Sequence, residues 1–109
     1  MSPTADMTDL ANLADLVQVQ PQSTVSRTVL KAEGTNVVLF AFDTDEELRE
    51  HTAAIPVLLQ TLEGAFDITA DGRTVTLRPG DLIHLRTRVP HAVKALEPSK
   101  LALFLLTND

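Results

Sequence analysis

The sequence predicts an all-β fold in which about eight short strands form a closed barrel or a sandwich. After Pro21, turn signals recur at intervals of about eight to twelve residues, and the segments between them are short and apolar. Helix-length segments do not alternate with these strands, which argues against a parallel sheet with crossover helices. The length of 109 residues suits a single domain.

The strands are expected from apolar runs and from residues that alternate at period two. Asp71-Gly72 lies between alternating apolar residues and predicts a two-residue hairpin. The segments Asp43-Thr44-Asp45 and Pro79-Gly80-Asp81 predict turns. The expected strands are, in chain order, 25–32, 37–42, 55–62, 65–70, 75–77, 82–85, 91–96 and 101–107.

The N-terminal part has a different pattern. Apolar residues recur there at helical spacing, which predicts a short helix over 8–17 with Thr8 as its N-cap and Pro21 at or after its end. Residues 1–7 are expected to be a disordered tail. We therefore divide the chain into an N-terminal tail and short helix over 1–20 and a barrel over 21–109. The apolar residues at helical spacing are Leu10, Leu13, Leu16 and Val17.

Composition excludes several classes of function. The net charge of −6 disfavours nucleic-acid binding, because an acidic surface repels phosphates. The absence of cysteine excludes disulfides, zinc–thiolate sites, iron–sulfur clusters and cysteine nucleophiles. The sequence shows no secretory signal and no apolar stretch of about 18 residues. We therefore expect a cytoplasmic protein that binds neither membranes nor nucleic acid.

Two spaced groups of residues carry a resemblance to a known family. The first group contains His51 and Gly64, and the second contains Gly80 and a Pro90-His91 pair. With these residues at this spacing, and with the strand pattern around them, residues 42–106 resemble the cupin superfamily, in particular its small single-domain bacterial members of the RmlC-like type. The resemblance implies a double-stranded β-helix, or jelly-roll, barrel.

The metal ligands of the family are only half present. Metal-binding cupins usually hold one ion with two histidines and a glutamate from the first motif and a histidine from the second. In this chain those positions are occupied by His51, Ala53, Val57 and His91. Alanine and valine cannot coordinate a metal. The resemblance therefore implies a degenerate site, in which His51 and His91 could bind one divalent transition ion such as Fe, Mn, Ni or Zn.

A catalytic metal site normally has three or more protein ligands, so a third donor would have to join the two histidines. His84 and Gln60 are the candidates. The alternation of strand 82–85 leaves open which face of the barrel His84 occupies. On a regular strand Gln60 faces away from the site, so it would need a bulge or another register. Bound water could complete the shell.

Two arginines stand in the second motif where the family has proline and glycine. Arg86 and Arg88 would flank the loop at the mouth of the pocket. An arginine there could bind an anionic ligand through bidentate hydrogen bonds. The alternative is a solvated loop charge or an ion pair. We include Arg86 with His51, His91 and His84 as candidate pocket residues.

Three functions are compatible with the sequence. The first, which we favour, is a small-molecule-binding cupin with an apolar pocket anchored by His51 and His91. The second is a metal-dependent dioxygenase or isomerase acting on a small organic acid or ketone. The third is an interaction role in which the barrel exists to oligomerise. Small cupins are commonly homodimers, and pairing of exposed edge strands would favour this state here.

Overall fold

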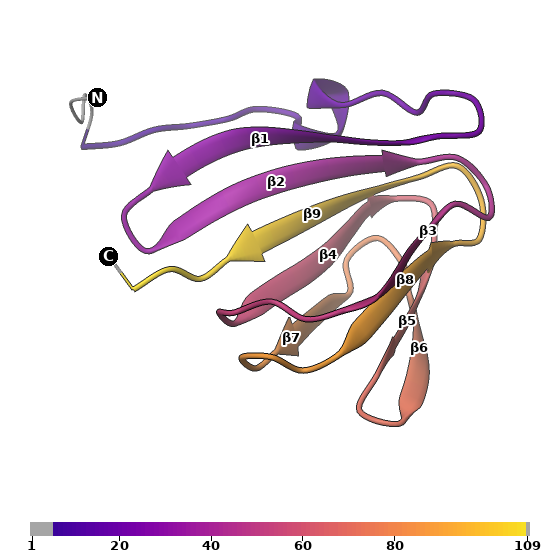
Figure 1. Ribbon diagram of the computed structural model, residues 1–109. Helices are drawn as coiled ribbons and strands as arrows, with labels where there is room; N and C mark the ends of the chain where they lie inside the picture. The colour runs from indigo at the N-terminus through magenta and orange to yellow at the C-terminus, as the bar shows by residue number, and fades with distance from the viewer. Residues whose placement is uncertain (1–5, 109) are drawn as a thin grey trace.

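The computed structural model describes residues 6–108, which form nine strands and one turn of 3-10 helix. The strands are antiparallel to their sheet neighbours and lie in two sheets that face each other (Figure 1). This confirms the predicted all-β class. The elements are η1 (Leu13–Leu16), β1 (Thr24–Ala32), β2 (Thr35–Phe42), β3 (Glu47–His51), β4 (Val57–Glu63), β5 (Phe66–Ala70), β6 (Arg73–Leu77), β7 (Leu82–Leu85), β8 (His91–Ala95) and β9 (Ser99–Leu105).

The two sheets have the crossed strand order of a jelly roll. One has five strands in the order β1-β2-β9-β4-β7, and the other has four in the order β3-β8-β5-β6. The core between them is apolar and includes an edge-to-face contact of Phe42 with Phe66, whose ring centroids are 5.1 Å apart. Strands β6 and β7 are the edges at which the two sheets approach each other around a cavity described below.

Strand β2 is apolar on both faces because both faces are covered. Phe42 lies in the core between the sheets, whereas Leu39 and Ala41 belong to a second apolar cluster on the outer face of the five-stranded sheet. Residues 12–22, here called the strap, contribute Leu13, Leu16, Val17 and Val19 to that cluster. A continuous apolar run is the expected sequence of a strand with two buried faces.

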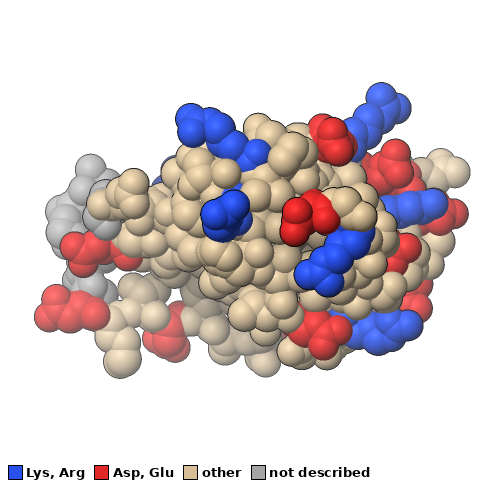
Figure 2. Space-filling model, turned by 90° about the horizontal axis from the view of Figure 1, so that it is seen from below, with Lys and Arg blue, Asp and Glu red and all other residues tan. Residues whose placement is uncertain are grey.

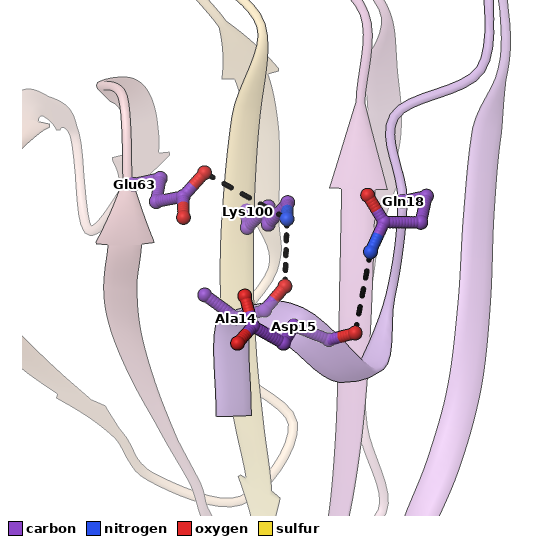
Figure 3. A network of polar contacts seen from close by, with 5 residues as sticks. All are labelled: Ala14, Asp15, Gln18, Glu63 and Lys100. Carbon is purple, nitrogen blue, oxygen red and sulfur yellow. Dashed lines mark hydrogen bonds and ion pairs between the residues drawn. The ribbon is translucent and has the colours of Figure 1, made fainter. Parts of the chain in front are cut away.

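Lys100 fastens the strap to the sheet. Its side chain is buried, and its Nζ atom donates a hydrogen bond of 2.6 Å to the carbonyl oxygen of Ala14 in η1 (Figure 3). Glu63 Oε1 lies 3.7 Å from the same nitrogen. The amide of Gln18 donates to the carbonyl oxygen of Asp15 and closes the turn (Figure 3). These contacts hold the one helical turn against β9.

The expected N-terminal helix over 8–17 is wrong. The structure has only the four-residue 3-10 turn, which begins after Asn12 instead of Thr8 and ends before an extended Val17. Asn12 adopts a left-handed conformation, and Asp15 N donates to its carbonyl oxygen. Leu10 remains exposed. One turn suffices to bury the remaining apolar residues, and an isolated short helix is marginal without further packing. Most of the expected disordered tail lies outside the described residues.

Strand β3 was not predicted. Its residues are mostly charged and exposed, and it forms the edge of the four-stranded sheet. A charged edge strand lacks the apolar alternation from which the other strands were predicted, although charge is a common protection of sheet edges. His51 is the last residue of this strand.

The predicted hairpin at Asp71-Gly72 is confirmed. Ala70 pairs with Arg73, and both loop residues have positive φ, as a type I′ turn requires.

Within residues 6–108, no helix is long and apolar enough to cross a membrane.

Candidate functional site

A β-bulge brings the two motif histidines together at one end of the barrel. Strand β3 pairs with β8 through Leu48 and Val93, and then carries one extra residue before His51 pairs with His91. Without this bulge, His51 would lie on the opposite face from Leu48, which packs against the core. The two imidazole rings are 4.2 Å apart between centroids, at 57° to each other.

The hydrogen bonds of both histidines fix their neutral tautomers. His51 Nδ1 lies 2.8 Å from the carbonyl oxygen of Arg49, and His91 Nδ1 lies 2.9 Å from that of Val89. A carbonyl oxygen only accepts, so each Nδ1 must donate. In the neutral rings both Nε2 atoms therefore carry a lone pair, and neither bonds another side chain or backbone group within residues 6–108. His91 is 4% exposed and His51 is exposed, so the pair bridges the interior and the surface.

The donor set does not fit a catalytic metal with three protein ligands. The other two family positions hold Val57, which is fully packed in the core, and Ala53, which packs against it. In the part of the chain that the structure describes, no group of three or more His, Cys, Asp or Glu side chains could hold an ion. Two imidazole nitrogens are the available ligands.

Neither candidate third ligand faces the histidine pair. On β7, Ile83 and Leu85 point into the core, and the alternate residue His84 lies on the other face, paired with Leu58 of β4. Gln60 is two residues further along β4 and shares that outer face. The register of β4 is regular from Val57 to Thr61, so no bulge turns Gln60 toward the histidines. Neither His84 nor Gln60 completes the site.

A cavity of about 220 Å³ opens beside the histidine pair, between β5, β6 and β7. Its wall is mostly apolar, and its charged residues are Asp71, Arg73 and Arg86; His84 also borders it, although its side chain lies on the outer face of β7. His51 and His91 do not line it. Ala70 separates them, because it pairs with His91 on one side and belongs to the cavity wall on the other. The apolar part of the wall consists of Ile68, Ala70, Val75, Ile83, Leu85 and Val89.

The loop over 86–90 links the cavity to the histidines. Val89 lines the cavity, and its carbonyl oxygen accepts the His91 hydrogen bond. Arg88 adopts a positive φ of 62°, and its backbone N–H donates to the carbonyl oxygen of Ala53 at 2.9 Å. This loop therefore spans the mouth of the barrel. It carries Arg86 on the cavity side.

Arg73 is a candidate site residue that the sequence did not single out. It pairs with Ala70 across the β5–β6 hairpin, and Ala70 pairs with His91. Directly paired residues share a face of a sheet. His51, His91, Ala70 and Arg73 therefore form one row across the four-stranded sheet, and Arg73 is its last member. The signal in the sequence is its position directly after the Asp71-Gly72 turn.

The family follows from the fold together with this motif spacing. A family model described as a cupin domain matches residues 39–107, more than half of the chain. The chain belongs to the cupin family. No curated protein gives a significant match.

Solved structures share the whole cupin barrel. A cupin superfamily protein of Desulfitobacterium hafniense superposes with a TM-score of 0.83 at 22% identity, over 94% of each chain. A conserved protein of unknown function from Streptococcus pyogenes gives 0.83 at 22% identity, over 100% of this chain and 97% of that one. An RmlC-like cupin of Desulfovibrio desulfuricans gives 0.81 at 24% identity, over 92% and 97%. At these identities the likeness establishes the fold alone.

Proposed function

We propose that this cupin binds a small organic molecule at the open end of its barrel, with His51 and His91 as polar anchors. One observation carries the proposal. Both Nδ1 atoms are engaged by backbone carbonyl oxygens, so the neutral rings hold two Nε2 lone pairs on neighbouring strands that bond no protein group within residues 6–108. Such a pair can accept hydrogen bonds from a hydroxyl or amide group of a ligand.

The cavity beside the pair supplies apolar contact area for the ligand. Small-molecule sites are typically concave and apolar, with a few polar groups that fix orientation. At about 220 Å³ the cavity holds the liquid volume of roughly seven water molecules. The ligand is therefore a small metabolite, and the cavity is not large enough for a nucleotide or an extended peptide.

We favour binding over metal-dependent turnover because of the donor set. A dioxygenase or isomerase acting on an organic acid or ketone would need a third protein ligand. The positions that supply it in other cupins hold Ala53 and Val57, and His84 and Gln60 face outward. The metal-dependent alternative is distinguished by the test below.

The test is a small-molecule screen by chemical-shift perturbation on the ¹⁵N-labelled protein. Hits are expected to shift amides around His51, His91 and the loop over 86–90. Each ligand should bind roughly three- to ten-fold more weakly to the His51→Gln and His91→Gln variants, as for loss of one hydrogen bond. Gln60→Ala changes the outer face of the same barrel and should leave affinity unchanged.

Two outcomes would overturn the proposal. The first is a screen without a ligand, or ligands whose affinity is the same in both histidine variants. The second is about one transition metal per purified chain that disappears in the His51→Ala/His91→Ala double variant. The latter result would replace metal-free binding with the metal-dependent enzyme.

We also propose that the chain forms a homodimer through β1. This nine-residue strand is an edge of the five-stranded sheet and pairs with β2 alone among the described strands. A long unpaired edge readily pairs with another chain. Sedimentation velocity at micromolar concentration should give a dimer, and a monomer at all concentrations would refute this assembly.

A further inference from the structure

Three arginines lie at the mouth end of the barrel of an otherwise acidic chain, Arg73 directly after the Asp71-Gly72 turn and Arg86 and Arg88 in the loop after β7. Four of the six arginines lie between residues 73 and 88, although the net charge is −6. Within residues 6–108, no carboxylate oxygen lies within 4.0 Å of their guanidinium groups. Seen from below Figure 1, some basic side chains lie among uncharged surface and others lie beside acidic side chains (Figure 2). The four arginines are Arg73, Arg78, Arg86 and Arg88.

Two of these arginines border the cavity from opposite edges. Arg73 begins β6 and ends the row of paired residues that contains both histidines. Arg86 follows the last residue of β7, across the gap between the two sheets. Both line the same cavity, so each arginine can reach a ligand in the cavity from its own side.

The charged side chains that line the cavity, here called its rim, favour a ligand with one negative charge. Besides the two arginines, its charged groups include one carboxylate, Asp71. Together, these three side chains carry a net charge of +1. A monoanion would balance this charge, whereas Asp71 would repel the second charge of a phosphate or dicarboxylate. Arginine matches a carboxylate through two parallel hydrogen bonds.

The rest of the wall selects for an apolar body. Ile68, Val75 and Ile83 line the inner part of the cavity. Removal of apolar surface from water stabilises such a contact in proportion to the area buried. We infer that the ligand is a small monocarboxylic acid, with its carboxylate between Arg73 and Arg86 and its carbon skeleton against these three side chains. This inference rests on the proposed function.

The test compares acids with uncharged molecules of the same skeleton. Titration calorimetry with hexanoate and benzoate, each against its primary amide, measures what the charge contributes. At least one acid is expected to bind about ten-fold or more tightly than its amide. This preference should vanish in both Arg73→Gln and Arg86→Gln. Arg78→Gln removes an arginine that follows the other end of β6 and does not line the cavity, and should keep the preference.

The outcomes separate this inference from the proposed function. Equal binding of acids and amides, or preference retained in both cavity variants, overturns the carboxylate assignment while small-molecule binding stands. Failure of both acids to bind, when the general screen finds uncharged ligands, overturns the assignment in the same way. A screen without any ligand overturns the proposed function itself. Loss of the preference in Arg78→Gln would show a diffuse charge effect in place of a carboxylate site.

Discussion

The Gly64→Ala substitution tests the closest backbone approach in the barrel. Gly64 has a φ of +80°, and a Cβ atom built on it would overlap the hydroxyl of Ser99. The same Cβ would lie 2.7 Å from the carbonyl oxygen of Pro98. Ser99 is fully buried, and its Oγ accepts a hydrogen bond from Ala65 N at 3.0 Å. The serine must move to admit a methyl group, so this bond would be lost.

The expected magnitude is a sum of three effects. The left-handed conformation costs alanine about 1–2 kcal/mol, less about 0.4–1 kcal/mol because alanine restricts the unfolded chain. Overpacking adds about 1–3 kcal/mol, and a buried amide without its partner adds about 1–3 kcal/mol. The total of about 2–8 kcal/mol is a large part of the roughly 5–15 kcal/mol that stabilises a typical domain.

Gly72→Ala is the matched control. Gly72 has a φ of +72°, but a Cβ atom there would meet nothing within 4 Å. Its substitution should cost about 1 kcal/mol, from the backbone conformation alone. For a domain of this size, the midpoint of thermal unfolding should fall by about 4 °C in Gly72→Ala and by about 8 °C or more in Gly64→Ala. Equal losses in the two variants would refute the steric explanation.

Three further substitutions test other parts of the fold. Lys100→Met removes the donor that holds η1, so hydrogen exchange of the strap amides should accelerate by the equivalent of about 1.5–3 kcal/mol, and unchanged protection would contradict this role. Backbone amides of Gln22 and Thr44 hold the pKa of Asp43 below its usual 3.8. The ionised carboxylate of Asp43 therefore stabilises the folded protein above pH 3.8, and this contribution is lost as the pH falls through the lower pKa of the folded state. Urea unfolding of Asp43→Asn should accordingly show a smaller loss of stability on acidification than the wild type. Phe66→Ala empties the centre of the core and should cost about 3–5 kcal/mol in urea unfolding, whereas a cost below about 1 kcal/mol would show that the core collapses around it.

Most of the barrel could be predicted because most of its strands are apolar. Strand β2 and the hairpin at Asp71-Gly72 were found from local signals alone. A run of apolar residues marks the strand, and a turn-forming dipeptide marks the hairpin. Strand β3 could not be found in this way. It is an exposed edge, and its pairing with β8 is decided by residues more than forty positions away. The helix over 8–17 was overestimated because contact with the sheet, not helical propensity, determines the conformation of the strap.

The candidate site was predicted in its residues but not in its geometry. The spacing of the motifs identified His51 and His91, and the structure pairs them. The position of a bulge is not encoded in a local pattern. The side-chain orientations of His84 and Gln60 therefore became known only with the register of β4 and β7. Arg73 became visible as a site residue only when three strand pairings were combined.

The position of β9 has a consequence for how the chain folds during synthesis. This strand comes last in the sequence, yet it lies between β2 and β4 at the centre of the five-stranded sheet. Until residue 105 has left the ribosome, β2 and β4 have no shared neighbour, and their apolar faces remain exposed to other chains. Completion of this sheet must therefore wait until β9 has been synthesised and then close long loops, which is slow and favours early association with chaperones.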